Sequence, residues 1–211
     1  MKKVLLLGDS IRMGYCKYVR MAFEDAAEIV FPEDCCRFAA YTLRYLTTWK
    51  SETGCDKDLD VVHWNAGLWD VLRLLDGNVQ TEPEVYRSYI DRICNVLKIQ
   101  YPNARMIFAT STAVQEHLYG ALKRYNCDIR QYNDIASEVV LSHGGQINDL
   151  YAVTEGLPAE YYSDATHFNT MDGTRIVAGK VISTLEDALS IPARVLDYQA
   201  IFEKQTKIIG M

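Results

Sequence analysis

Near the start of the chain lies the stretch Val4-Leu5-Leu6-Leu7-Gly8-Asp9-Ser10. A short apolar run ended by a glycine is typical of a strand buried on both faces of a parallel sheet. The next stretch, residues 11–27, has the apolar spacing of a helix. The Ser10 hydroxyl is therefore predicted to lie at the carboxyl end of the first strand and at the start of a helix.

Strand and helix patterns alternate through the remainder of the chain. Because parallel strands need crossover connections, this alternation predicts one α/β domain with a parallel, doubly wound, three-layer sheet. In such sheets, functional sites gather at the carboxyl ends of the strands. Further strands are expected at residues 28–31, 60–64, 105–110 and 146–150, and further helices at residues 41–49, 83–101, 128–142 and 172–189.

The composition limits the classes of protein to consider. The 211 residues suffice for one substantial core, and the formal net charge of −6 argues against nucleic acid or anionic membranes as partners. The apolar run in MKKVLLLGDS is too short for a signal peptide, so we expect a cytoplasmic protein. Six cysteines without a CxxC pair argue against a zinc site and against a small disulfide scaffold.

Ser10 is the first candidate for chemistry. A helix start offers free backbone N–H groups and a positive dipole end, which stabilise a negative oxygen beside a nucleophile. The structural alternative is equally physical, because serine is a favoured N-cap and Gly-Asp-Ser is a common turn composition. The motif alone does not decide between these interpretations.

Asp164-Ala165-Thr166-His167 precedes the last long helix. A serine nucleophile needs an imidazole as base, and the imidazole needs a partner on its other nitrogen. An aspartate three residues before a histidine can supply that partner. The alternatives are a turn-capping Asp164 with a surface His167, or a metal site that also uses Asp9.

Asn65 directly follows the third predicted strand, within Trp64-Asn65-Ala66-Gly67-Leu68-Trp69-Asp70. Its amide could donate to the oxyanion of a tetrahedral intermediate, or could simply tie down the turn. Ser10, Asn65 and the Asp164–His167 pair all fall on one edge of the predicted sheet. This shared placement favours an active site over isolated structural roles.

The set of Gly8-Asp9-Ser10, an Asn/Gly-rich block after the third strand, and Asp164-x-x-His167 resembles the SGNH (GDSL-type) hydrolase superfamily. The resemblance covers residues 4 to about 180. It implies a flavodoxin-like α/β/α sandwich around a five-stranded parallel sheet, with no cofactor and no metal. It also implies that Ser10 attacks an ester carbonyl, that His167 is its base and that Asp164 orients His167.

The chain departs from the family pattern in the oxyanion hole. The segment 32–39 lacks the family's second-block glycine, so a backbone N–H within Cys36, Arg37 and Phe38 is expected to replace it. In the third block Trp69 stands where the family has asparagine. Asn65 is therefore the preferred side-chain donor, with the Trp69 indole as substitute.

Residues 1–190 are expected to form the hydrolase domain, and residues 191–211 a helical extension of it, with Val195, Tyr198 and Phe202 at helical spacing. Whether this extension packs on the domain or on a second subunit is left open. The expected activity is hydrolysis of small O-acyl esters, acetyl first, on a small molecule or a carbohydrate. Lipid or thioester hydrolysis, and a non-catalytic sugar- or phosphate-binding module, are the alternatives. Arg37, Trp69, Tyr161 and Tyr162 are expected at the substrate rim.

Overall fold

The computed structural model describes the backbone of residues 1–209 and the side chains of residues 1–204. Five parallel strands form one sheet in the order β2-β1-β3-β4-β5. This order is the flavodoxin-like arrangement that the family resemblance implies. The strands are β1 (Lys2–Leu7), β2 (Ala27–Val30), β3 (Val61–Trp64), β4 (Arg105–Ala109) and β5 (Gln146–Asn148).

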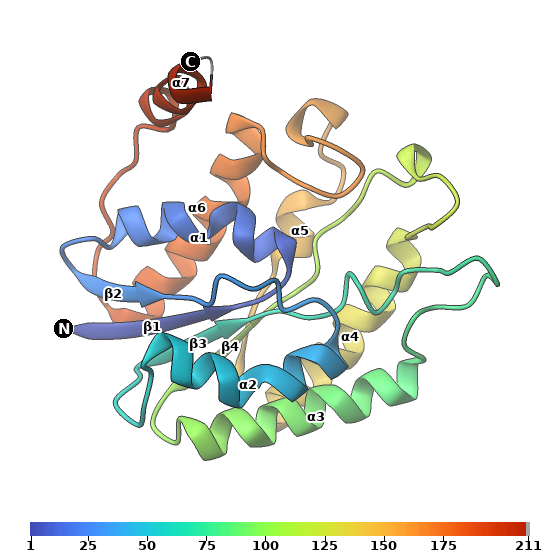
Figure 1. Ribbon diagram of the computed structural model, residues 1–211, viewed down its shortest axis with the longest axis horizontal. Coiled ribbons are helices and arrows are strands. Elements are labelled where there is room, and N and C mark those ends of the chain that lie inside the picture. Colours follow the sequence, from blue (N-terminus) through green and yellow to red (C-terminus); the bar gives the residue numbers. More distant parts are fainter. Residues whose placement is uncertain (210–211) are drawn as a thin grey trace.

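Helices cover both faces of the sheet, which confirms the three-layer prediction. In Figure 1, α1 and α6 lie on one side of the sheet, and α2, α3 and α4 lie on the other. The described helices are α1 (Ser10–Ala22), α2 (Ala39–Thr53), α3 (Pro83–Gln100), α4 (Asn126–Ser142), α5 (Leu150–Thr154), α6 (Met171–Leu189) and α7 (Tyr198–Ile209), with short 3₁₀ turns at Glu116–Leu118 and Ala159–Tyr161.

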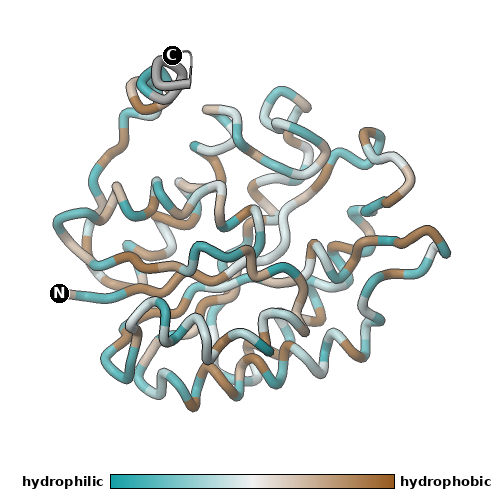
Figure 2. Tube along the Cα trace, in the orientation of Figure 1, coloured by the Kyte–Doolittle hydropathy of each residue, from teal (hydrophilic) through white to brown (hydrophobic). Residues whose placement is uncertain are grey.

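The core lies on both faces of the central strands. Residues 4–7 of β1 are at most 1% exposed, as a strand covered by helices on both sides requires. Figure 2 shows hydrophobic residues concentrated along the central strands. Within residues 1–209, none of the helices combines the length and the apolar character needed to cross a bilayer.

The first helix is shorter than the predicted 11–27. It ends at Ala22, and the backbone N–H groups of Ala26 and Ala27 donate to the Phe23 carbonyl in a tight turn. Ala27 then pairs with Lys2 as the first residue of β2. The helix stops early because the chain must reverse to place β2 beside β1.

The C-terminal stretch differs from the predicted helix over residues 191–211. Ser190 ends α6 in a left-handed conformation (φ 55°), and Pro192 cannot continue a helix. Val195, expected on a helical face, lies in the extended segment and is 94% exposed. The helix begins only after this segment, and residues 210–211 of the prediction lie outside the described residues.

Candidate active site

Ser10 lies at the junction of β1 and α1. The helix cap is Asp9, whose Oδ1 accepts a hydrogen bond from the Ile11 N–H at 3.0 Å. Because Asp9 performs the capping, the Ser10 hydroxyl is free of that role. The N-cap alternative for Ser10 is therefore wrong, and the cap falls one residue earlier.

The Ser10 hydroxyl is joined to His167 and Asp164 in one hydrogen-bonded chain. His167 Nε2 lies 2.7 Å from Ser10 Oγ, and His167 Nδ1 lies 2.7 Å from Asp164 Oδ2. Ser10 and His167 are 157 residues apart in the chain. Both links have the length expected of a nucleophile, its base and the partner of that base.

The Asp164 carboxylate is fixed by its own loop. Its Oδ1 accepts hydrogen bonds from the backbone N–H groups of Thr166 and His167, at 2.7 and 2.9 Å. Partial burial acts to raise the pKa of Asp164, but these two N–H groups and the His167 imidazole outweigh it and hold the pKa below its ordinary value. Asp164 therefore stays ionised, as an acceptor for the Nδ1–H of His167 must be.

Asn65 leans over the backbone of Gly8, two residues before Ser10. Asn65 is 4% exposed, and a Cβ built on Gly8 would lie 1.9 Å from Asn65 Oδ1. Burial raises the pKa of Asp9, and the Asn65 amide is the strongest of the groups that oppose this shift, although no described residue makes a hydrogen bond to Asp9 Oδ2. The amide of Asn65 therefore faces the residue next to Ser10.

The structure corrects the position of the second-block donor. The Cys36 N–H donates to the Gly8 carbonyl at 2.9 Å, and Cys36 Sγ accepts the Gly8 N–H at 3.1 Å. The N–H and the thiol of Cys36 both bind the backbone of Gly8, so the Cys36 N–H is not available to an oxyanion. Arg37 adopts a left-handed conformation (φ 51°), which normally selects glycine. Its N–H donates to no carbonyl within the described chain and faces the Cys35 thiol, a weak acceptor. Of the predicted trio, Cys36 is therefore excluded, and the N–H groups of Arg37 and Phe38 remain the candidates.

A buried arginine anchors this loop, and sequence reasoning missed it. Arg12 is 1% exposed, and its guanidinium donates to the carbonyls of Pro32 at 3.0 Å, Asp34 at 2.5 Å and Gly8 at 3.4 Å. A charged side chain in a helix next to the core gives no local signal that its partners are carbonyls of a distant loop.

Trp69 and Asp70 follow Asn65 in the loop after β3. Trp69 is partly buried, and its indole makes no hydrogen bond within the described residues. Asp70 is fully buried and accepts the Ala39 N–H at the start of α2, at 3.2 and 3.1 Å from its two oxygens. Burial raises the pKa of Asp70 to about 7 despite that hydrogen bond.

The loop after β4, residues 110–125, supports the Asp164–His167 segment from outside. The Gln115 N–H donates to the Ala165 carbonyl at 2.9 Å, and the Tyr119 hydroxyl lies 2.5 Å from Thr166 Oγ1. Both contacts fall on residues between Asp164 and His167. Sequence reasoning missed this support, because no motif in residues 110–125 indicates it.

A small apolar pocket opens beside Ser10 and His167. Its volume is about 10 Å³, roughly the space of one water or one methyl group. The pocket lies between α1 and the start of α6, and is lined by Ser10, Ile11, Gly14, Tyr15, His167, Phe168, Asn169, Thr174 and Val177. Tyr162, expected at the rim, is instead 7% exposed and packs on Phe168 with ring centroids 4.3 Å apart.

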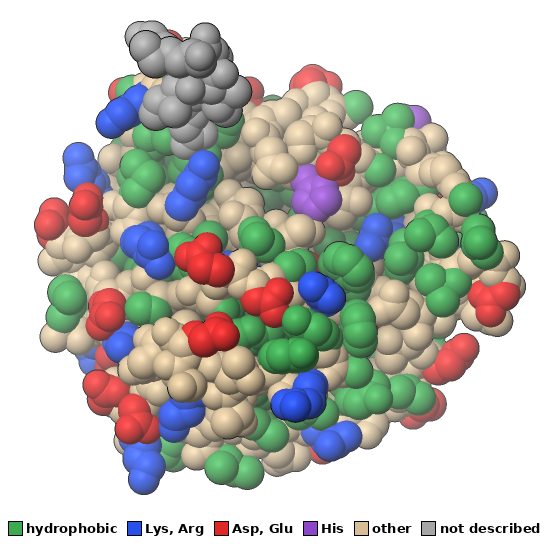
Figure 3. All heavy atoms as spheres, in the orientation of Figure 1, with side chains coloured by type: hydrophobic (Ala, Val, Ile, Leu, Met, Phe, Trp, Pro, Cys, Tyr) green, Lys and Arg blue, Asp and Glu red, His purple; other side chains and the backbone are tan. Residues whose placement is uncertain are grey.

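The charged side chains on the face drawn in Figure 3 are of both signs. Figure 3 shows acidic and basic side chains interspersed over this face of the molecule. Within the described residues, no three His, Cys, Asp or Glu side chains lie close enough to hold a metal ion. Asp9, Asp164 and His167 therefore do not form the metal cluster that the sequence left open.

No protein-family model and no curated protein sequence matches the chain. Solved structures do match it over most of both chains. A lipase/acylhydrolase from Enterococcus faecalis is 19% identical, with 89% of this chain and 96% of that one covered and a TM-score of 0.69. An acetyl xylan esterase is 20% identical, with coverage of 87% and 99% and a TM-score of 0.66.

A member of the lipolytic protein G-D-S-L family from Veillonella parvula gives a third match, at 15% identity, coverage of 87% and 97%, and a TM-score of 0.63. At these identities the matches concern the fold. The chain has the fold of these lipases, esterases and acylhydrolases, as its sequence motifs predict.

Proposed function

We propose that this protein is a serine esterase that hydrolyses small O-acyl esters, with Ser10 as nucleophile, His167 as base and Asp164 as the partner of His167. The observation that carries the proposal is the hydrogen-bonded chain of these three side chains, at 2.7 Å for each link. The shared fold with lipases, acylhydrolases and an acetyl xylan esterase supports it.

The reaction is a two-step acyl transfer. His167 Nε2 takes the proton of the Ser10 hydroxyl as Oγ attacks the ester carbonyl carbon. The N–H group of Ser10 at the start of α1, a loop N–H from Arg37 or Phe38, and the amide of Asn65 hold the negative oxygen. His167 then gives the proton to the alcohol oxygen, the C–O bond breaks, and water releases the acid from Ser10 by the same steps in reverse.

The acyl group of the preferred substrate is short, with acetyl first. The pocket beside Ser10 supports this choice, because its space of about 10 Å³ between Ile11, Tyr15 and Val177 suits a small group such as a methyl. An acetyl ester on a carbohydrate is the favoured class, since an acetyl xylan esterase is among the structures that share the fold. Hydrolysis of 4-nitrophenyl acetate should exceed that of the octanoate in kcat/KM.

The proposal is tested by labelling and by kinetics together. A fluorophosphonate should phosphonylate Ser10 Oγ with loss of fluoride, and Ser10→Ala should abolish labelling and lower kcat on 4-nitrophenyl acetate by roughly 10³-fold or more. Ser88→Ala, on the exposed side of α3, is the matched control and should change neither. Unlabelled, correctly folded native protein would contradict the mechanism. Ligand affinity without turnover, retained in Ser10→Ala, would favour the binding-module alternative.

A further inference from the structure

Arg124 forms no salt bridge with any described residue, and it contacts two loops of the candidate active site. Its Nε donates to the Leu68 carbonyl at 2.5 Å, and its Nη1 lies 3.4 Å from the Tyr119 hydroxyl. Its guanidinium carbon lies 5.7 Å from the centroid of the Tyr119 ring. Within the part of the chain that the structure describes, no acid pairs with Arg124, and its Nη2 makes no hydrogen bond.

Two contacts place Arg124 between the loop of the predicted oxyanion donor Asn65 and the loop of the predicted base His167. Leu68 lies three residues after Asn65, in the same loop. Tyr119 contacts Thr166, the residue before His167. The positive charge of Arg124 also lowers the pKa of Asp9, which is next to Ser10, although burial is the dominant influence on that group. Arg124 therefore lies beside both the loop that carries Asn65 and the loop that carries His167.

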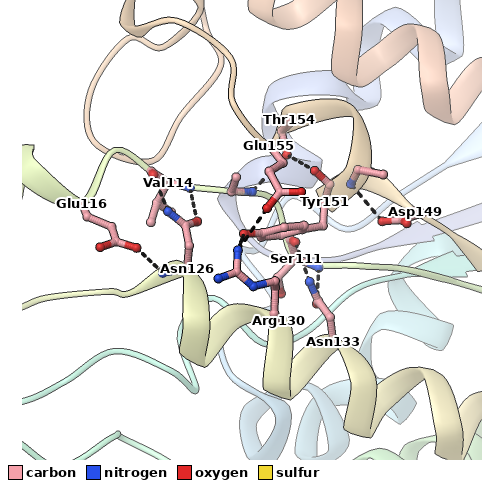
Figure 4. A network of polar contacts seen from close by, with 12 residues as sticks. Ser111, Val114, Glu116, Asn126, Arg130, Asn133, Asp149, Tyr151, Thr154 and Glu155 are labelled. Carbon is pink, nitrogen blue, oxygen red and sulfur yellow. Dashed lines mark hydrogen bonds and ion pairs between the residues drawn. The ribbon is translucent and has the colours of Figure 1, made fainter.

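The loop that carries Arg124 is held rigidly. The Asn126 side-chain amide accepts the Val114 N–H and donates to the Val114 carbonyl, both at 3.0 Å. The backbone N–H of Asn126 donates to the Glu116 carboxylate at 2.6 Å. The Asn133 side-chain amide likewise accepts the Ser111 N–H at 2.8 Å and donates to the Ser111 carbonyl at 2.9 Å. Figure 4 shows these side chains of α4 pointing at the segment after β4. A binding group on such a frame loses little conformational entropy when a ligand arrives.

The neighbouring arginines differ from Arg124 in being paired. Arg73 forms two hydrogen bonds with Asp128, and Arg130 pairs with Glu155 at 3.0 Å. In a chain with a net charge of −6, a partly buried arginine that lacks such a partner has its charge available for a ligand. One available guanidinium suits a single negative charge better than a dianion.

We propose that Arg124 determines substrate specificity by binding a singly charged anionic group, such as a carboxylate, on the alcohol portion of the ester. The acyl group occupies the pocket between α1 and α6, so the charged group lies on the opposite side, toward Leu68 and Tyr119. This inference rests on the proposed esterase activity and names the class of alcohol that the site selects.

The test compares charged and neutral esters that share the acetyl group. 3- and 4-acetoxybenzoate carry the carboxylate at two distances from the scissile bond, and their methyl esters are the neutral counterparts. The measured quantity is the ratio of kcat/KM for each acid to that for its methyl ester. Arg124→Gln should lower this ratio about 10-fold or more for at least one isomer, as expected for loss of a charged hydrogen bond. Arg124→Lys should lower it less.

Lys123→Gln is the matched control, because it removes the same charge from the adjacent, exposed position. An equal fall of the ratio in Lys123→Gln and Arg124→Gln would mean that the overall positive charge of the loop, and not a contact with Arg124, causes the effect. That result would overturn the proposal. An unchanged ratio in Arg124→Gln would overturn it directly. Should Arg124→Gln not fold, Arg124→Met, which also removes the charge, takes its place, and an unchanged ratio in that variant would overturn the proposal.

A binding measurement separates this proposal from the esterase proposal. Calorimetry with Ser10→Ala should detect 3- or 4-acetoxybenzoate binding that weakens about 10-fold in Ser10→Ala combined with Arg124→Gln. Binding that depends on Arg124, in a protein whose native form hydrolyses no ester, would refute the esterase and leave the anion site standing. Hydrolysis that depends on Ser10 but not on the carboxylate would refute the anion site alone.

Discussion

At the scale of single residues, Gly8 is constrained by space. A Cβ at this position would lie 1.9 Å from Asn65 Oδ1 and 2.8 Å from Arg12 Cβ. Gly8 also holds Cys36 through two hydrogen bonds. Because Gly8 has no side chain, the loops that carry Ser10, Cys36 and Asn65 can pack against one another.

Gly8→Ala should lower kcat/KM about 100-fold, because the new methyl group displaces the predicted oxyanion donor Asn65. It should also destabilise the fold by about 1–3 kcal/mol through overpacking. Ester hydrolysis and urea denaturation measure the two effects. Gly120→Ala is the control, since a Cβ there meets nothing within 4 Å. Unchanged activity in Gly8→Ala would show that Asn65 has no part in catalysis.

Arg37 is the residue that departs furthest from its preferred backbone conformation near the site. A left-handed conformation costs a non-glycine residue about 1–2 kcal/mol. The Arg37 guanidinium lies 4.6 Å from the centre of the Tyr41 ring, a contact that partly offsets this cost. The Arg37 N–H is turned away from carbonyl partners because of that conformation.

Arg37→Gly should be more stable than Arg37→Ala by about 1 kcal/mol, since both variants lose the contact with Tyr41 and only glycine relieves the backbone. The midpoints of urea unfolding give the comparison. Equal midpoints would mean that the loop relaxes out of the left-handed conformation. Both variants should keep esterase activity, because a backbone donor needs no particular side chain.

At the scale of secondary-structure elements, Asp70 joins the loop after β3 to the first turn of α2. Its two oxygens accept the Ala39 N–H, and the loop with Arg37 leads directly into that turn. The pKa of Asp70 is raised by burial to about 7, well above its ordinary value of 3.8. The native state therefore holds this proton more tightly than the unfolded chain.

Protonated Asp70 stabilises the fold, so its contribution is complete below about pH 4 and is lost as the pH rises through about 7. Asp70→Asn cannot titrate but keeps an acceptor for the Ala39 N–H. The free energy of unfolding of the native chain, minus that of Asp70→Asn, should fall between pH 4 and pH 7. Urea titrations across this range measure it, and a constant difference would contradict the raised pKa.

At the scale of the whole molecule, α7 covers α1 of the same chain. Tyr18 of α1 is 2% exposed and stacks on Tyr198 at 5.7 Å and on Phe202 at 6.1 Å between ring centroids. The sheet and its flanking helices all lie within residues 2–189. The C-terminal helix therefore adds cover to a domain whose layers are complete before it.

Removal of residues 197–211 should leave a folded, active protein. Exposing Tyr18 should lower the free energy of unfolding by about 1.5–3 kcal/mol. Thermal unfolding and ester hydrolysis of the shortened chain are the measurements, and Tyr198→Ala in the full chain should reproduce part of the loss. A shortened chain with no cooperative transition would show that α7 belongs to the folding core.

The sequence by itself determined the parallel sheet, the edge at which the site lies and the three residues of the hydrogen-bonded chain. It could do so because apolar runs, crossover lengths and the GDS and DxxH motifs are local patterns. The tertiary structure decided that the Cys36 N–H is taken by the Gly8 carbonyl, that Asp70 holds α2, and that Arg124 forms no salt bridge with any described residue. These depend on contacts between side chains and backbone groups 28 to 56 residues apart, which only close packing of the folded chain creates.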